Sequence, residues 1–171
     1  MLVRWFNIAL LLSLARSLQG FSSSSRSQHR LNTNQADSTT ASLALFSPCK
    51  INLFLRIIRK REDGYHDLAS LFQAIGFGDK LKLSRIDQSA DVFTCNMEGV
   101  PTDSSNLVIR ALDLMREKTG IQQFFSAELL KQVPAQAGLG GGSANAATAM
   151  WGANELMGRP ATLEQVSTVD L

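Results

Sequence analysis

Five short segments of the chain have the apolar spacing of β-strands, and two further segments favour helix. The strand-like segments cover residues 43–47, 51–58, 80–86, 92–97 and 124–133. The first helix is expected to be capped by Asn106, to run through Lys118 and to end at Gly120. Its apolar residues recur at the spacing of one buried face, which indicates core packing rather than a site. The second helix is expected from Ser143 to about Met157.

Proline and glycine separate the strand-like segments. Pro48 divides the first two strands, and Gly78–Asp79 predicts a turn before the third. The order along the chain is therefore strands, a helix, a strand, a glycine-rich loop and a second helix. This order predicts an α+β domain in which a mixed or antiparallel sheet is backed by helices.

The composition is that of an ordinary soluble domain. The 171 residues are 44% hydrophobic and 19% charged, which is enough for one domain with a core. A net charge of +2 is too small to indicate a nucleic-acid partner, and Arg59–Lys60–Arg61 is interpreted as a solvated strand end. The two cysteines, Cys49 and Cys95, form no disulfide framework and no metal site, so we expect free thiols and no metal bound by the protein.

The first 41 residues have the character of a targeting sequence. Residues 1–20 combine Arg4, an apolar stretch and small residues, the pattern of a signal peptide too short to span a membrane. Residues 21–41 are rich in serine and basic residues, as in a disordered transit peptide. The two together resemble the bipartite presequence that directs proteins into plastids enclosed by the endomembrane system. Secretion is the alternative. The mature domain is expected to occupy residues 42–171, with no stable membrane anchor after processing.

The glycine-rich stretch before the second helix is the strongest chemical signal. Four glycines, at positions 138, 140, 141 and 142, come directly before the helix, and Ser143 is predicted to be its N-cap. The free N–H groups and the positive end of the helix dipole would then form a cradle for a di- or triphosphate. A Walker A loop would need lysine at Gly142, and the dinucleotide fingerprint would need glycine at Ser143. The alternative is a flexible linker with no binding function, but linkers rarely run directly into a capped helix.

Two polar pairs accompany the loop. Lys50 and Asn52 alternate along a predicted strand and so face the same way, toward solvent or into a site. Tyr65 and His66 follow a predicted Asp-Gly turn, and such a pair suits a flat heterocycle as well as an ordinary surface. Lys131, just before the loop, is either a ligand to the nucleotide or a solvent-facing strand end.

Taken together, these motifs resemble the GHMP small-molecule kinases, and in particular the branch that acts on a cytidine diphosphate sugar alcohol. The resemblance covers about residues 43–165 and rests on three motifs in order: Ser-Pro-Cys-Lys-Ile-Asn, Asp-Gly-Tyr-His-Asp-Leu and Pro-x-x-x-Gly-Leu-Gly-Gly-Gly-Ser followed by Asn-Ala-Ala. One departure is Ala144, where that branch usually carries a second serine. The resemblance implies the N-terminal domain of these kinases, with a ribosomal-protein-like β-α-β core.

The resemblance also implies a role for each residue. Lys50 is then catalytic, beside the accepting hydroxyl, and Asn52 holds the sugar-alcohol end of the substrate. Tyr65 stacks on cytosine and His66 binds its edge. ATP, with its Mg²⁺, is bound by residues in and around the loop: Lys131, Pro134, Gly138, Leu139, Gly140, Gly141, Gly142, Ser143 and Asn145.

One expected part of such a kinase is missing from these residues. The family's general base is an aspartate in a Gly-x-Asp-x-Pro segment, which this sequence lacks, and Asp170 precedes the expected register. We therefore expect an N-terminal portion without the C-terminal domain and inactive alone. A non-catalytic nucleotide-binding module remains the alternative. A sibling kinase of mevalonate or homoserine is disfavoured by the Asp-Gly-Tyr-His motif.

Overall fold

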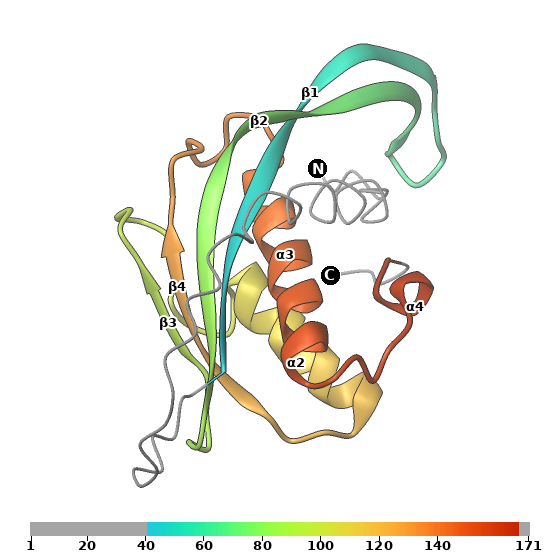
Figure 1. Cartoon of the computed structure of the whole chain (residues 1–171). Helices are drawn as coiled ribbons and strands as arrows, with labels where there is room; N and C mark the ends of the chain where they lie inside the picture. Colours follow the sequence, from blue (N-terminus) through green and yellow to red (C-terminus); the bar gives the residue numbers. More distant parts are fainter. Residues whose placement is uncertain (1–40, 168–171) are drawn as a thin grey trace, which may run out of the picture.

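A computed structural model describes residues 41–167 of the chain (Figure 1). The predicted presequence, apart from Ala41, and Asp170 lie outside the described residues. The sheet has four strands in the order β1-β2-β4-β3. These strands are β1 (Ser42–Lys60), β2 (His66–Ile86), β3 (Val92–Cys95) and β4 (Phe124–Leu130). The helices are α2 (Leu107–Thr119), α3 (Gly141–Leu156) and the short α4 (Leu163–Ser167).

The sheet is mixed, which is one of the two arrangements that the order of segments predicted. β1 pairs antiparallel with β2, and β2 pairs antiparallel with β4. β3 instead runs parallel to β4, and α2 forms the connection between them. The prediction of an α+β domain with helices on a mixed sheet is confirmed.

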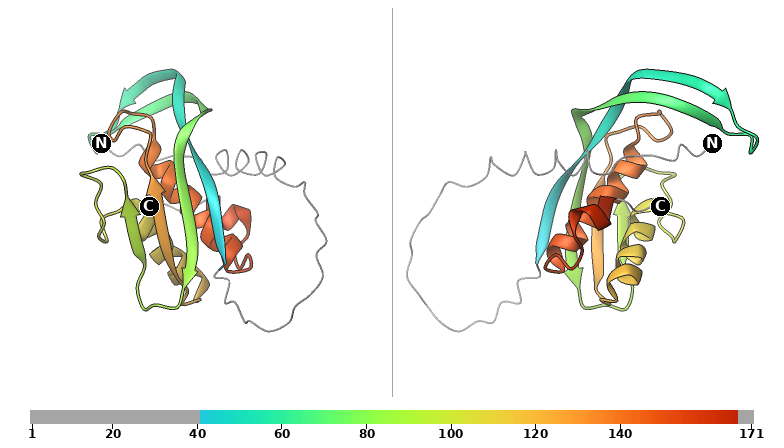
Figure 2. Two further views of the ribbon diagram at one scale, coloured as in Figure 1. Left: turned by 60° about the vertical axis from the view of Figure 1, so that its left-hand side comes forward. Right: turned by 90° about the vertical axis from the view of Figure 1, so that its right-hand side faces the viewer.

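Helices α2 and α3 cover one face of the sheet, and the core lies between the two layers (Figure 2). α3 is lined with small residues, and its alanines at 144, 146, 147, 149 and 153 are all buried. A side chain at Gly152 would place its Cβ 2.6 Å from Leu45 Cδ1 and 3.2 Å from Leu83 Cδ2. The missing side chain therefore lets α3 lie close against β1 and β2.

The ends of α2 agree with the sequence prediction. The Asn106 side chain accepts a hydrogen bond from the Val108 N–H at 2.8 Å, which is the expected N-cap contact. Gly120 lies in the left-handed region with φ of 72°, and its N–H donates to the Arg116 carbonyl. The apolar residues of this helix form the expected buried face: Ala111 and Met115 are buried, and Leu107 and Leu114 are partly buried against the core.

The prediction of two strands divided by Pro48 is wrong, because β1 runs without a break from Ser42 to Lys60. The predicted turn at Gly78–Asp79 is wrong as well, since both residues lie inside β2. Pro48 pairs with Gly78, and the register shifts between Pro48 and Lys50. A Cβ at Gly78 would lie 2.8 Å from Pro48 Cα and 2.9 Å from Phe46 Cζ. Glycine is therefore present because two backbones approach closely, and not because the chain turns.

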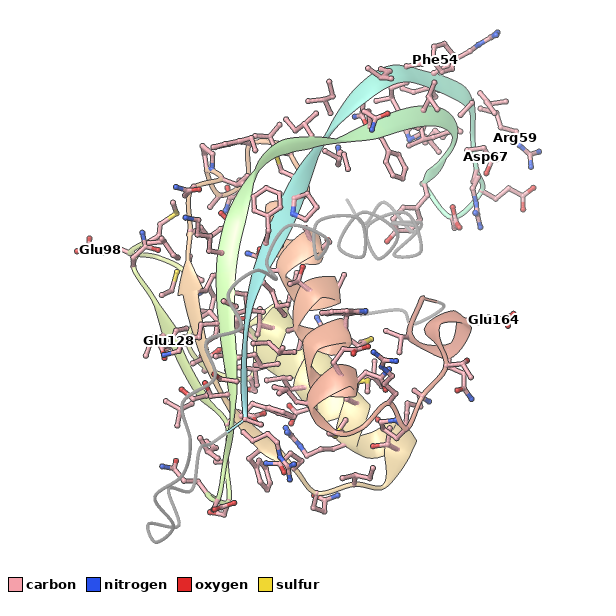
Figure 3. The ribbon with its side chains drawn as sticks, viewed as in Figure 1. Phe54, Arg59, Asp67, Glu98, Glu128 and Glu164 are labelled. Carbon is pink, nitrogen blue, oxygen red and sulfur yellow. The ribbon has the colours of Figure 1, made fainter. Side chains whose placement is uncertain are left out.

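The distal half of the β1–β2 pair extends beyond the sheet as a long curved hairpin (Figures 1 and 2). Its strands contain further register shifts, between Asn52 and Phe54 and between Ile57 and Arg59. Large apolar side chains on this part are exposed, among them Leu53, Phe54, Leu55, Ile57, Ile58 and Leu71. Near the hairpin tip, the exposed Arg59 forms an ion pair with Asp67 at 2.6 Å (Figure 3). The basic run is thus a solvated strand end, as predicted.

Within residues 41–167, no helix combines the length and the apolar character that crossing a membrane requires.

Candidate functional site

The glycine loop connects β4 to α3 at the end of the sheet from which the hairpin projects (Figure 1). Gly138 and Gly140 have φ values of 72° and 69°, a conformation that other residues rarely adopt. α3 begins earlier than predicted: its N-cap is Gly140, and Ser143 is its third residue. The left-handed conformation at Gly140 allows Gly141 and Gly142 to enter the helix, so the prediction that Ser143 is the N-cap is wrong.

The first turn of α3 has no side-chain cap. The first helical bond is donated by the Ala144 N–H to the Gly140 carbonyl at 2.9 Å. The N–H groups of Gly141, Gly142 and Ser143 therefore have no acceptor within the helix. Uncapped N–H groups at the positive end of a helix dipole suit an anion such as a phosphate group.

Lys50 is in direct contact with this loop. Its ammonium group donates to the Gly138 carbonyl at 2.7 Å and to Asn52 Oδ1 at 3.3 Å. Its backbone N–H donates to the Leu139 carbonyl at 2.9 Å. The structure thus brings together two predicted site segments that are 88 residues apart in the chain. A positive charge lies beside a loop whose shape suits phosphate.

A buried ion pair lies below the loop. Lys131 Nζ is 2.6 Å from Asp79 Oδ2, and their side chains are only 6% and 0% exposed. Asp79 Oδ1 accepts the N–H groups of Gln132 and Val133 at 2.7 and 2.8 Å. Burial alone would raise the pKa of Asp79, but the hydrogen bonds from Lys131, Val133 and Gln132 outweigh it and lower that pKa. The solvent-facing alternative for Lys131 is therefore wrong.

Asn145 is also directed below the loop. It is buried, and its Oδ1 accepts a hydrogen bond from Ser47 Oγ at 2.8 Å. It also lies near enough to the Asp79 carboxylate to help lower the pKa of that group. In this structure Asn145 links β1 to α3, so its predicted contact with ATP stays a prediction. The other predicted loop residues, Pro134 and Leu139, are exposed and partly buried respectively.

Tyr65 and His66 lie at the opposite end of the hairpin from Lys50. His66 pairs with Lys60 at the tip, while Lys50 pairs with Ala74 where the hairpin leaves the sheet. Tyr65 is 52% exposed, and His66 is exposed as well. Ten residues of strand between Lys50 and Lys60 correspond to about 33 Å of strand length. The structure therefore does not bring this pair to the glycine loop, and their predicted cytidine contacts stay predictions.

The sequence reasoning missed two residues of the site, Asp79 and Ser47. Asp79 was assigned to a turn, although it stands two residues before Leu81 and so continues the alternation of Leu81 and Leu83. An aspartate in phase with the buried positions of a strand was the signal available, since a buried carboxylate needs a cation, and Lys131 was considered only as a nucleotide ligand or a solvent-facing residue. Ser47 belongs to a recognised motif, but nothing in the sequence shows that its partner is Asn145.

The described residues offer no cluster of three or more His, Cys, Asp or Glu side chains that could hold a metal ion. They do not fit a Mg²⁺ site made by protein side chains alone. Cys49 and Cys95 are both free thiols, as expected. Cys49 is buried in the irregular part of β1, and burial raises the pKa of its thiol.

Comparison with known proteins agrees with this arrangement. Residues 106–169 match the family described as GHMP kinases N terminal domain. The domain described above is a GHMP kinase N-terminal domain. A solved structure titled 4-(cytidine 5'-diphospho)-2C-methyl-D-erythritol kinase aligns with a TM-score of 0.61 at 30% identity, over 73% of this chain and 44% of that one. The resemblance predicted from the three motifs is confirmed.

Two curated relatives of this GHMP kinase domain have the same activity in their names. The chloroplastic 4-diphosphocytidyl-2-C-methyl-D-erythritol kinase of Arabidopsis thaliana is 61% identical over 117 residues, which are 68% of this chain and 30% of the relative. The enzyme of Protochlamydia amoebophila is 50% identical over 137 residues, 80% of this chain and 47% of the relative. The chain thus spans 30% of the first of these relatives and 47% of the second.

Proposed function

We propose that this domain is the nucleotide-binding part of an ATP-dependent kinase. Its substrate is 4-diphosphocytidyl-2-C-methyl-D-erythritol, phosphorylated at the 2-hydroxyl in the non-mevalonate route to isoprenoids. The observation that carries the proposal is the contact of Lys50 with a glycine loop that opens onto the uncapped start of α3. The names of the relatives support the substrate, and the word chloroplastic in the plant names supports a plastid location.

The geometry suits phosphoryl transfer, which depends mainly on positioning and on charge stabilisation. The free N–H groups of α3 would bind the phosphate oxygens of ATP, and the Lys50 ammonium would add positive charge beside the transferred group. Mg²⁺ would arrive with the nucleotide and neutralise part of the phosphate charge. Asn52, whose side chain accepts a hydrogen bond from the Lys50 ammonium, would orient the sugar-alcohol end of the substrate.

The base that takes the hydroxyl proton is a separate question. The carboxylate that contacts the entry of the loop, Asp79, is fully buried and paired with Lys131. It presents no oxygen to a substrate, and the hydrogen bonds that lower its pKa make it a poor base. We propose that residues 1–171 bind ATP but do not transfer its phosphoryl group, and that the cytidine contacts of Tyr65 and His66 belong to a longer form of the protein.

The test compares two proteins. The 171-residue chain is expected to bind ATP in calorimetry and to release no ADP with any acceptor. The protein encoded by the complete transcript is expected to phosphorylate the cytidine diphosphate substrate and neither mevalonate nor homoserine. Phosphorylation of mevalonate or homoserine alone would refute the proposed substrate. Substrate-dependent ADP release by the 171-residue chain would show that these residues already contain a base.

The variant Lys50→Met tests the contact between β1 and the loop. The side-chain bond to the Gly138 carbonyl is lost, while the backbone bond to Leu139 remains. A hydrogen bond from a charged donor contributes about 1.5–3 kcal/mol, so ATP binding by the 171-residue chain is expected to weaken at least tenfold. Amide hydrogen exchange at residues 136–140 should become faster.

The matched control is Lys80→Met, which removes the same charge from an exposed position in β2. ATP affinity and loop exchange should stay within about twofold of the unmodified chain, because Lys80 faces solvent on the side of β2 opposite Asp79, where salt screens its charge. Equal losses in the two variants would mean that Lys50 acts through general charge and not through its contact with the loop.

A further inference from the structure

We infer that Asp79 is a positioning residue for the glycine loop: it holds the residues that enter the loop and, through Lys131, the residue that begins α3. The inference rests on the proposed binding of ATP at this loop. It assigns a role to a residue that contacts neither the solvent nor the predicted ligand and that belongs to none of the three sequence motifs.

The entry of the loop is fixed by a single carboxylate. One oxygen of Asp79 accepts the N–H groups of both Gln132 and Val133, and the other accepts the Lys131 ammonium. The three donors are consecutive residues that directly follow β4. Asp79 therefore connects β2 directly to the entry of the loop, and reaches the exit of the loop through Lys131.

The exit of the loop is held by the other member of the ion pair. A Cβ built on Gly141 would lie 3.1 Å from Lys131 Nζ and 3.0 Å from Val133 Cγ1. The Lys131 ammonium thus packs against the first residue of α3, at the positive end of the helix dipole. A buried cation is unfavourable there unless it is paired, and Asp79 provides the compensating charge. Loss of that charge would displace Lys131 and with it the start of the helix.

The direction in which ATP affinity changes when Asp79 is neutralised distinguishes a positioning role from a purely electrostatic one. A negative charge below the phosphate site repels an anion, so electrostatics alone predicts tighter ATP binding when Asp79 becomes neutral. Positioning predicts weaker binding, because the free N–H groups of α3 no longer point at one place. The two accounts therefore give opposite results for the same variant.

The experiment uses the 171-residue chain with Asp79→Asn, which keeps an oxygen acceptor for Gln132 and Val133 but loses the charge that pairs with Lys131. ATP affinity, measured by calorimetry well below the unfolding temperature, is expected to fall about tenfold, which corresponds to about 1.4 kcal/mol. Amide hydrogen exchange should become faster at residues 134–143. Unchanged or tighter ATP binding by a folded Asp79→Asn chain would overturn the inference.

Asp91→Asn is the matched control. Asp91 is also a buried aspartate that pairs with a buried cation, Arg116, and accepts a backbone N–H, that of Phe125. It lies beside β3 and β4, away from the loop, so this variant should lose stability and keep its ATP affinity within about twofold. An equal loss of affinity in both variants would mean that general destabilisation explains the effect, and would overturn the inference.

A second pair of variants decides the case if Asp79→Asn does not fold. The double variant Asp79→Asn, Lys131→Met contains no unpaired buried charge, whereas Lys131→Met keeps the Asp79 carboxylate with its two backbone hydrogen bonds and no counter-charge. If Asp79 acts through Lys131, the two should bind ATP with affinities within about twofold of each other. A further tenfold change in the double variant would overturn the inference. Failure of the unmodified chain to bind ATP would refute the proposed function, and this inference with it, whereas the results above concern Asp79 alone.

Discussion

Replacing Gly78 by alanine is expected to destabilise the domain by about 3 kcal/mol, at the upper end of the range for overpacked cores. The added Cβ would meet the Ser47 carbonyl oxygen, and it would lie 2.8 Å from Pro48 Cα. Both contacts are with backbone atoms, which cannot move away by rotating a side chain. The strands β1 and β2 would have to separate where Pro48 pairs with Gly78. Urea unfolding of the 171-residue chain, followed by circular dichroism, measures the loss.

The control for this variant is Gly76→Ala, two residues earlier in the same strand. A Cβ at Gly76 would meet no atom within 4 Å, and the backbone there has no positive φ. Its free energy of unfolding should change by less than about 0.5 kcal/mol, as at other unconstrained surface positions. Equal stability of the two variants would show that β1 and β2 do not depend on close contact at Gly78.

Loss of Arg116 is the second change with a large expected effect. Arg116 forms two hydrogen bonds with Asp91, at 2.6 and 3.2 Å, and one with the Gln123 carbonyl at 3.1 Å. Its guanidinium also lies 4.6 Å from the centre of the Phe124 ring. Arg116→Met would leave the Asp91 carboxylate, which is 4% exposed, without a counter-charge. Breaking one side of a buried pair in this way costs about 3–5 kcal/mol, which urea unfolding would show directly.

Two further variants test whether the unpaired Asp91 carboxylate causes the loss of stability in Arg116→Met. Lys82→Met breaks the exposed pair between Lys82 and Glu128, which lies on the face of the sheet away from the helices (Figure 3), and should cost less than about 1 kcal/mol. Arg116→Met combined with Asp91→Asn removes both charges and should recover part of the stability. If the double variant were no more stable than Arg116→Met alone, lost packing and not the unpaired carboxylate would explain the effect.

Local signals predicted the parts of this domain that depend on neighbouring residues. Asn106 and Gly120 fix the ends of α2 through contacts within one turn, and both roles were clear from the sequence. The glycine loop was also clear, but its cap was misplaced by three residues. A serine before a helix and a glycine in the left-handed conformation both serve as caps, and only the backbone angle of Gly140 decides between them.

Contacts between distant segments were not predictable in the same way. Gly78 has the sequence of a turn, and its real function appears only when Pro48 is placed against it. Asp79 and Lys131 are 52 residues apart, and each has an ordinary local explanation as a turn or a strand end. The motif resemblance found the residues on the surface of the site. The buried polar residues that hold the loop in place became visible only in three dimensions.

The irregular pairing at Pro48 has a consequence for which changes in the gene this region tolerates. Side chains alternate along a strand, so adding or removing one residue turns every later side chain to the opposite face. A deletion of Cys49 would turn the remaining residues of the hairpin over relative to the sheet, and would direct Lys50 away from the Gly138 carbonyl. A substitution here changes the contacts of one residue. The loss of a single codon would instead reverse the direction of every later side chain in the distal part of β1. Natural variation in β1 is therefore expected as exchanges of residues at constant length.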